Sequence, residues 1–318
     1  MSAVASPDES WVRVPAFAKL NLSLRVLYKR PDGFHELRSV FQTISLADTI
    51  AIEYQRGRTR IDLKSNLNIP DNLVVRAADS VMKIMRATGS LRFILTKRIP
   101  LGGGLGGGSS NAAAVLLALP RLLGKSVPIE RLIELAAELG SDVPFFLLGG
   151  TAAGLGRGTE LYPLPDAPSR PGLLVVAGIH SSTSDAYAAL HRKVFPEVPP
   201  DRINKFQAVT WDMEMGWTND FETVVFHQHP QLESIQGKLL KLGAWRAMMT
   251  GSGSALFGLF PSRELRDRAA DWFRKEFSSY QVHPFAMVTR NRYQALWRRQ
   301  LEVSPGNRTW PPQDRYAR

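Results

Sequence analysis

The sequence contains no cysteine among its 318 residues. This absence excludes disulfide bonds, thiolate metal sites and cysteine nucleophiles. No hydrophobic run approaches the roughly 20 residues that a membrane-spanning helix needs. The first residues also lack the basic segment and the apolar core of a secretory signal. We therefore expect a soluble, cytoplasmic protein without a membrane partner.

Acidic residues are in the minority, with 29 Asp and Glu against 40 Lys and Arg, which gives a net charge of +11. Such an excess suits a nucleic acid, a membrane surface or a polyphosphate ligand. Much of it lies in residues 290–318, which carry seven Arg and two acidic residues. Because the rest is only modestly basic, the distribution argues against nucleic acid. We expect the tail to be a solvated or packed extension, with contact to RNA or a membrane as the alternative.

The length allows two domains, and the hydrophobic patterns alternate between strands and helices. Residues 19–27 alternate apolar with polar side chains, which predicts a half-buried strand. Helices are predicted at 71–89 with Asp71 as the N-cap, at 109–119 with Pro120 ending or kinking the helix, and at 129–140, 184–194, 219–228, 230–242 and 263–277. Strands are expected at 91–98, 172–179 and 281–289. The mixture indicates an α+β protein, divided into residues 1–165, 166–290 and a basic extension 291–318.

Six of the seven residues from Gly102 to Gly108 are glycine, and this run lies between a predicted strand and a predicted helix. Glycine loses the most backbone freedom on folding, so such a run must meet a structural need. A strand, a glycine loop and a helix present backbone N–H groups and the positive helix end to an anion. We predict a phosphate-binding loop, with Ser109, Ser110 and Asn111 near phosphate or Mg²⁺.

Other glycine motifs fit this loop less well. A P-loop needs Gly-Lys-Ser/Thr, and no Lys follows these glycines. The spacing of Gly102, Gly104 and Gly107 satisfies the dinucleotide fingerprint, but that motif belongs in the first βα unit of a parallel sheet. The lysine strand and catalytic loop of protein kinases are missing. A flexible linker is disfavoured because regular elements adjoin the run on both sides.

Two charged residues stand in unusual surroundings. Lys19 begins the first alternating strand with Asn21 on the same face, and Asp142 precedes Pro144 and an apolar segment. Taken locally, Lys19 is an ordinary strand-edge lysine, and Asp142 is as well explained as an N-cap as by a catalytic role. The turn at Gly251 and Gly253 is either a hairpin connection or a loop that closes over the phosphate site. No metal site is predicted, since the His227 and His229 pair has no third ligand nearby.

Taken together, the segments "PAFAKLNL", "PLGGGLGGGSSNA" and "TGSGSALF", in this order, resemble the three motifs of the GHMP small-molecule kinases. The resemblance covers about residues 11–289. It implies a two-domain architecture with an N-terminal mixed or antiparallel sheet with helices and a C-terminal ferredoxin-like α/β sandwich. Further stretches, "AKLNLSLRVLYKRPDGFHELRSVFQTISLADTI", "DNLVVRAA", "LGSDVPFFLLGG" and "NDFE", are similar to the kinases of 4-diphosphocytidyl-2-C-methyl-D-erythritol within this family.

The resemblance implies ATP-dependent phosphorylation of the 2-hydroxyl of that cytidine-linked substrate, in the methylerythritol phosphate route to isoprenoids, with ATP and Mg²⁺. A homoserine or mevalonate kinase of the same family is an alternative, against which the "KRPDGFHE" turn argues. A basic RNA-binding protein is a third possibility, but the aromatic and basic signatures of RNA-binding modules are missing. The oligomeric state is expected to be monomeric or homodimeric.

The same resemblance implies roles for individual residues. Asp142 would orient the substrate hydroxyl and accept its proton, and Lys19 would keep Asp142 ionised and stabilise the transferred phosphoryl group. Asn72 and Lys97 would lie near the adenine end of ATP, and Gly251 and Gly253 would close the site. The remaining ATP-binding residues would be Pro100, Leu101, Gly102, Gly103, Gly104, Leu105, Gly106, Gly107, Gly108, Ser109, Ser110 and Asn111.

The resemblance also implies a second set of residues for the alcohol substrate. Asn21 and Thr183 would place the methylerythritol part, and His35 would bind the cytosine or diphosphate end. Phe34 and Tyr187 would sandwich the cytosine ring. Many relatives have Tyr where Phe34 stands, so stacking is retained and a hydroxyl contact is lost.

Overall fold

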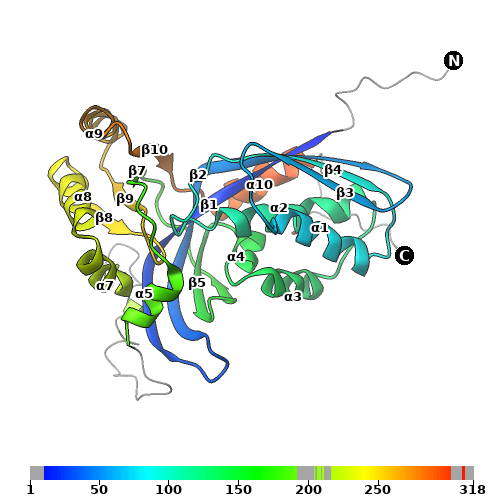
Figure 1. Ribbon diagram of the computed structural model, residues 1–318, viewed down its shortest axis with the longest axis horizontal. Coiled ribbons are helices and arrows are strands. Elements are labelled where there is room, and N and C mark those ends of the chain that lie inside the picture. The colour runs from blue at the N-terminus through cyan, green and yellow to red at the C-terminus, as the bar shows by residue number, and fades with distance from the viewer. Residues whose placement is uncertain are drawn as a thin grey trace.

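The computed structural model describes residues 11–191, 204, 206–208, 210, 216–301 and 310–311. Two β-sheets, each with its own helices, lie side by side (Figure 1). Contacts between β10 (Gln281–Ala286) and β2 (His35–Gln55) join the sheets. This arrangement confirms the predicted α+β fold with two sheets.

The first sheet has six strands and is built on a long antiparallel hairpin of β1 with β2. The strand order is β3-β4-β2-β5-β6, with β1 paired to β2, and only β3 and β4 are parallel to each other. Its remaining strands and the helix that connects β3 to β4 are β1 (Val12–Lys29), β3 (Arg60–Ser65), α1 (Leu73–Ile84), β4 (Ser90–Thr96), β5 (Thr151–Gly156) and β6 (Glu160–Pro163).

The second sheet has four antiparallel strands in the order β10-β7-β9-β8. Helix α8 packs on β8 and β9, and helix α9 packs on β7 and β10. The described elements of this part are β7 (Pro171–Val176), α5 (Thr183–Ala189), α7 (Asp220–Gln228), α8 (Pro230–Lys241), β8 (Arg246–Met249), β9 (Leu256–Leu259) and α9 (Arg263–Glu276).

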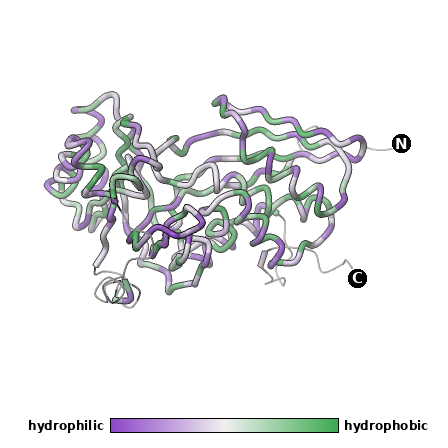
Figure 2. The backbone as a smooth tube through the Cα atoms, turned by 60° about the horizontal axis from the view of Figure 1, so that its bottom comes forward, coloured by the Kyte–Doolittle hydropathy of each residue, from purple (hydrophilic) through white to green (hydrophobic). Residues whose placement is uncertain are grey.

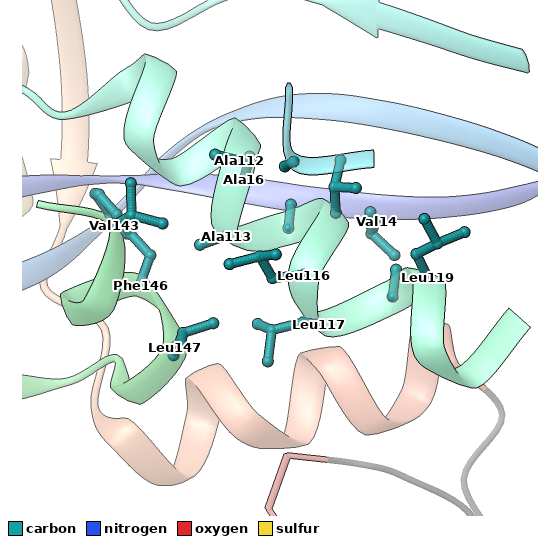
Figure 3. Packing of buried hydrophobic residues seen from close by; sticks show 14 of the residues in the cluster. Val14, Ala16, Ala112, Ala113, Leu116, Leu117, Leu119, Val143, Phe146 and Leu147 are labelled. Atoms are coloured by element: carbon teal, nitrogen blue, oxygen red, sulfur yellow. The ribbon is translucent and has the colours of Figure 1, made fainter. Parts of the chain in front are cut away.

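The core of the first part is centred on helix α2 (Gly107–Leu122), whose residues from Ser110 to Pro120 are all buried. Figure 3 shows its alanine and leucine side chains facing β1 and helix α4 (Val143–Leu148). Helix α3 (Ile129–Leu139) packs against both α2 and α4. Figure 2 shows green and purple alternating along the helices and strands, as expected where only one face of an element meets a core.

Helix α10 (Arg290–Gln300) is the last helix of the described residues and packs against β1. Its Tyr293 and Trp297 are 2% and 1% exposed and belong to the first core. The basic segment therefore begins as a packed helix of the first sheet's core, although it follows the second sheet in the chain.

The half-burial predicted for residues 19–27 is wrong. Lys19, Asn21, Ser23 and Arg25 on the polar face are all buried, like the leucines that alternate with them. Lys19 donates its backbone N–H to the carbonyl of Leu105, and the backbone N–H of Asn21 donates to the Thr250 hydroxyl. These bonds hold two loops, far away in the sequence, along the edge of β1, and the polar side chains have buried partners of their own, as Asn21 has in Lys19 and Ser39.

Three other details differ from the sequence predictions. Asn72, not Asp71, caps α1, since its side chain accepts a hydrogen bond from the Val74 N–H, whereas Asp71 has a positive φ of 47°. Pro120 lies inside α2, which continues to Leu122, so the helix does not end at the proline. The predicted helix 184–194 begins with α5, and its residues 192–194 lie outside the described residues.

Among the described helices, none combines the length and apolar character that crossing a membrane would require. The division at residues 165 and 290 stays a prediction, although the six strands of the first sheet all precede residue 164 and those of the second follow residue 170.

Candidate active site

A cavity of about 830 Å³ opens where the two sheets meet. Its wall combines the middle of β1, the glycine loop, the start of α4, the β5–β6 turn, α5 and the turn after β8. Eleven of the predicted site residues line it: Lys19, Asn21, Phe34, His35, Gly104, Gly106, Ser109, Asp142, Thr183, Tyr187 and Gly251. The fold thus gathers both predicted catalytic residues and all five predicted substrate residues around one space.

Lys19 and Asp142 form an ion pair in this cavity. The Nζ atom of Lys19 lies 3.4 Å from Oδ2 of Asp142, and it also donates a hydrogen bond of 2.6 Å to Oδ1 of Asn21. The Lys19 side chain is 4% exposed and that of Asp142 is 33% exposed. The ammonium group is therefore buried and held by Asn21 and Asp142, while the Asp142 carboxylate keeps a face open to a ligand.

The two interpretations of Asp142, as the N-cap of a short helix and as a catalytic residue, do not exclude each other. Asp142 occupies the N-cap position of α4, but its side chain accepts no capping hydrogen bond. Its carboxylate faces Lys19 instead, and its negative charge acts across the cavity on Tyr187. Burial, and after it the charge of Asp142, raises the pKa of the Tyr187 phenol, so the phenol stays protonated at neutral pH.

The glycine loop and the turn at residues 250–254 contact each other through their backbones. A Cβ atom on Gly104, where φ is +72°, would lie 2.4 Å from the carbonyl oxygen of Thr250, and one on Gly251 would lie 2.9 Å from Cα of Gly104. Asn219 holds the same turn by donating to the carbonyls of Met249 and Gly251. Part of the glycine requirement is thus a close approach of two chain segments.

A second reason for glycine in this loop lies at the beginning of α2. Gly106 is its N-cap with a φ of +68°, no side chain caps the first N–H groups, and the first turn carries no acidic residue. A Cβ atom on Gly106 would lie 2.9 Å from the ring of Phe146 and 3.2 Å from Cγ of Lys19. Since Gly106 and Ser109 line the cavity, the positive end of α2 lies beside the Lys19–Asp142 pair.

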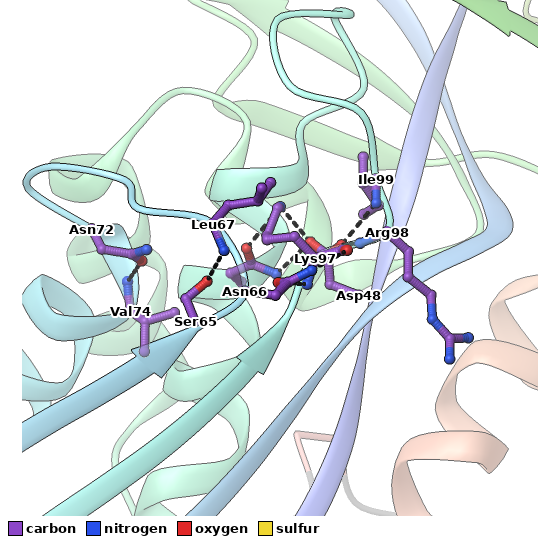
Figure 4. Close-up of polar contacts among 10 residues, drawn as sticks. Asp48, Ser65, Asn66, Leu67, Asn72, Val74, Lys97, Arg98 and Ile99 are labelled. Atoms are coloured by element: carbon purple, nitrogen blue, oxygen red, sulfur yellow. Dashed lines mark hydrogen bonds and ion pairs between the residues drawn. The ribbon is translucent and has the colours of Figure 1, made fainter. Parts of the chain in front are cut away.

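Lys97 and Asp48 lie in a network of polar contacts (Figure 4), which Asn111 joins. The Nζ atom of Lys97 lies 2.5 Å from Oδ2 of Asp48 and 3.1 Å from Oδ1 of Asn111, and Asn111 donates to the same Asp48 oxygen. Oδ1 of Asp48 accepts the backbone N–H groups of Arg98 and Ile99. The network fixes the strand end that leads into the glycine loop.

The remaining predicted ATP residues do not line the cavity. The Asn72 side chain caps α1, and Ser110 is 2% exposed within α2. Their predicted contacts with ATP, and that of Lys97, stay predictions, as do those of Pro100, Leu101, Gly102, Gly103, Leu105, Gly107, Gly108, Asn111 and Gly253.

Aromatic and basic side chains gather at the β1–β2 hairpin. The rings of His35 and Tyr187 stack at a centroid distance of 4.4 Å, and the guanidinium carbon of Arg157 lies 3.7 Å from the centre of the Phe34 ring. Burial and the positive charge of Lys29 lower the pKa of His35, so its imidazole is neutral at neutral pH. Both Phe34 and Tyr187 therefore have a stacking partner, and the predicted cytosine sandwich stays a prediction.

Sequence reasoning missed Asp48, Arg157 and Ser252. Asp48 carried a signal, since it is a carboxylate within the apolar strand "SLADTI" and such a group needs a buried partner. Arg157 lies between two glycines in the β5–β6 turn, and the Ser252 hydroxyl lies 2.9 Å from the Thr183 hydroxyl. Neither carries a local signal of its place in the cavity. Among the described residues, no cluster of three or more His, Asp or Glu side chains is arranged to hold a metal ion.

Comparisons with known proteins agree with this geometry. The model of the GHMP kinases N terminal domain matches residues 72–150, and that of the GHMP kinases C terminal matches residues 206–279. A 4-diphosphocytidyl-2-C-methyl-D-erythritol kinase of Solibacter usitatus is 53% identical over 308 residues, which are 95% of this chain and 96% of that protein. The enzyme of the same name from Thermotoga maritima is 41% identical over 77% of this chain and 91% of that one.

A crystal structure of a 4-(cytidine 5'-diphospho)-2C-methyl-D-erythritol kinase superposes with a TM-score of 0.74 at 35% identity, covering 86% of this chain and 98% of that one. A homoserine kinase from Cytophaga hutchinsonii shares only 16% identity, with a TM-score of 0.67 over 91% of this chain and 98% of that one, so it shows the fold alone. The family matches, the identities and the shared fold give one answer: this chain belongs to the GHMP kinase family and, within it, to the group of 4-diphosphocytidyl-2-C-methyl-D-erythritol kinases.

Proposed function

We propose that this protein transfers the γ-phosphoryl group of ATP to the 2-hydroxyl of 4-diphosphocytidyl-2-C-methyl-D-erythritol. The observation that carries the proposal is the Lys19–Asp142 ion pair, which opens into a cavity beside the first turn of α2. The names of relatives 53% and 41% identical to this chain support the choice of substrate.

In this proposal Asp142 is the residue that touches the reacting hydroxyl. Its partly exposed carboxylate accepts the hydroxyl hydrogen bond and orients the oxygen for attack. Lys19 holds that carboxylate in place and neutralises charge that develops on the transferred phosphoryl group. Phosphoryl transfer requires mainly alignment and charge stabilisation, so a weakly basic carboxylate suffices.

The residues at the start of α2 fit a phosphate chain. Gly104 and Gly106 leave the backbone bare, no carboxylate lies in the first helical turn, and Ser109 lines the cavity. The free backbone N–H groups of the first turn of α2 and the Ser109 hydroxyl would hold the phosphates of ATP. Mg²⁺, when bound, would neutralise phosphate charge, and Ser109 is the first-turn side chain at the cavity that would help hold it.

The hairpin end of the cavity is proposed as the site of the cytidine diphosphate part. Phe34 and Tyr187 offer aromatic faces, and His35 offers a neutral ring nitrogen. Asn21 and Thr183 would contact the methylerythritol part between this end and Asp142. We further propose that the enzyme acts in the cytoplasm, as a monomer or homodimer, on small-molecule substrates.

A coupled assay of ADP release tests the proposal. We expect turnover with the cytidine-linked methylerythritol and none with homoserine or mevalonate, and phosphorylation of the 2-hydroxyl should be visible by ³¹P NMR. Turnover only with homoserine or mevalonate would contradict the substrate assignment. Strong, salt-sensitive retention of RNA on filters, together with no kinase activity, would favour the RNA-binding alternative.

A further inference from the structure

The C-terminal segment contacts the helix that carries Asp142 at its amino end. The hydroxyl of Tyr293 on α10 donates a hydrogen bond of 2.5 Å to the carbonyl oxygen of Phe146, and Nε1 of Trp310 donates one of 2.7 Å to the carbonyl oxygen of Leu147. Both acceptors belong to α4, which is only six residues long. Figure 3 shows the pale salmon ribbon of α10 running beside α4 and α2.

These bonds supply what so short a helix lacks. The last four carbonyl groups of a helix have no partner within it. The carbonyl of Phe145 is satisfied by the N–H of Gly149, and the next two carbonyls accept from Tyr293 and Trp310. The C-terminal segment thus supplies donors for two of the last four carbonyl groups of α4.

Close packing reinforces the same contact. A Cβ atom on Gly149 would lie 2.3 Å from the Tyr293 ring, and one on Gly150 would lie 2.6 Å from Cβ of Arg290. Arg290 donates its backbone N–H to both oxygens of Asp166 at 2.9 Å and its guanidinium to the carbonyl of Thr151. The segment after α4 therefore has little room to move while α10 is in place.

We infer that Tyr293 and Trp310 are positioning residues that hold α4 so that Asp142 faces Lys19. The opposite end of α4 is the position of Asp142, whose side chain has no capping bond to fix it. A shift at the carboxyl end of a six-residue helix moves its amino end as well. The inference rests on the proposed function, because it assigns a role to the basic C-terminal segment through Asp142.

The test uses variants of the full chain: Tyr293→Phe removes one donor and keeps the ring, Trp310→Phe removes the other donor and keeps a smaller aromatic ring, and the double variant combines them. Tyr54→Phe is the matched control, since its hydroxyl donates to the carbonyl of Thr88 in the same part of the molecule and at 2.9 Å. Two quantities are measured below the unfolding temperature of every variant. They are kcat and KM for both substrates, and hydrogen exchange of a peptide spanning 143–150.

We expect the double variant to lose at least about tenfold in kcat, with KM values within about twofold of wild type, because small displacements of a catalytic group are costly. Exchange in 143–150 should become faster, and the control should change neither quantity. A kcat near wild type, an equal loss in Tyr54→Phe, or unchanged exchange would overturn the inference. If the wild type does not phosphorylate the cytidine-linked substrate, the proposed function fails, and the exchange measurement still decides whether the segment holds α4.

Discussion

The Nζ atom of Lys19 on β1 lies 3.4 Å from Oδ2 of Asp142 at the start of α4. This ion pair connects the first strand of the first sheet to a helix that comes more than 100 residues later in the chain. Asn21 binds the same ammonium group and donates its own amide to the Ser39 hydroxyl. The pair is thus fixed on the Lys19 side by buried hydrogen bonds. On the Asp142 side it is open to the cavity, which is the arrangement that a phosphoryl acceptor site needs.

Replacing Asp142 by Asn or Ala should lower kcat by at least about 10²-fold, the usual cost of removing one catalytic group. The Asp142 side chain caps nothing, but its removal leaves the buried ammonium group of Lys19 with Asn21 as its acceptor, so some loss of stability should accompany the loss of kcat. Steady-state kinetics and thermal unfolding measure both effects, with Asp79→Asn on α1, an exposed residue paired with Lys83, as the control. Near-normal turnover in Asp142→Asn would exclude the role.

Gly104→Ala should destabilise the protein and abolish ATP binding, because the added Cβ meets the Thr250 carbonyl at 2.4 Å and φ is +72°. Gly124→Ala is the matched control, with a φ of +64° and nothing within 4 Å of the added atom. The control should show only the strain of a left-handed alanine, about 1–2 kcal/mol. Urea unfolding should show a greater loss, by about 2 kcal/mol or more, in Gly104→Ala; equal losses would mean that the contact between the two turns is unimportant.

Lys97→Met separates a structural role of Lys97 from contact with ATP. The substitution breaks the buried ion pair with Asp48 and leaves its carboxylate without a cation, which should lower the free energy of unfolding by about 3–5 kcal/mol. Asp48→Asn combined with Lys97→Met should be less destabilised than Lys97→Met alone, since no charge is then left buried. A raised KM for ATP with unchanged stability would instead support the predicted position near adenine.

Glu222 makes the stability depend on pH. Burial raises its pKa to about 6, despite hydrogen bonds from the Met249 N–H and the Gln236 side chain. Since the folded-state pKa lies above the unfolded value, the contribution of Glu222 to stability is present below pH 4.5 and is lost as the pH rises through about 6. Glu222→Gln should therefore gain about 1 kcal/mol relative to wild type between pH 5 and pH 8.

Chemical unfolding at pH 5 and pH 8 measures the stability gained by Glu222→Gln. Glu233→Gln, an exposed position on the neighbouring helix α8, is the control. The amide introduced by Glu222→Gln would keep an oxygen that accepts from the Met249 N–H, so the strand before the 250–254 turn should stay in place. The same difference between variant and wild type at both pH values would show that Glu222 titrates normally.

The sequence carried the elements of the fold and most of the residues around the cavity. The alternation from Lys19 to Leu27 placed Lys19 and Asn21 on one face, and the glycine run before "SSNAAAVLLAL" marked the start of α2. Local sequence left the purpose of Asp142 open between capping and catalysis. It also misjudged the exposure of β1 and the N-cap of α1, because burial and capping depend on partners outside the local window.

What the sequence alone determined is the order of strands and helices and the chemical groups available, because hydrophobic periodicity and glycine placement are local properties of the chain. The tertiary structure alone decided that Lys97 turns to Asp48, that Gly104 meets Gly251, and that Tyr293 supports the helix beginning after Asp142. Each of these depends on two segments meeting in space. The partner of a buried charge, of a glycine backbone or of a helix-end carbonyl is set by which segments lie together in the fold, and these segments can be far apart along the chain.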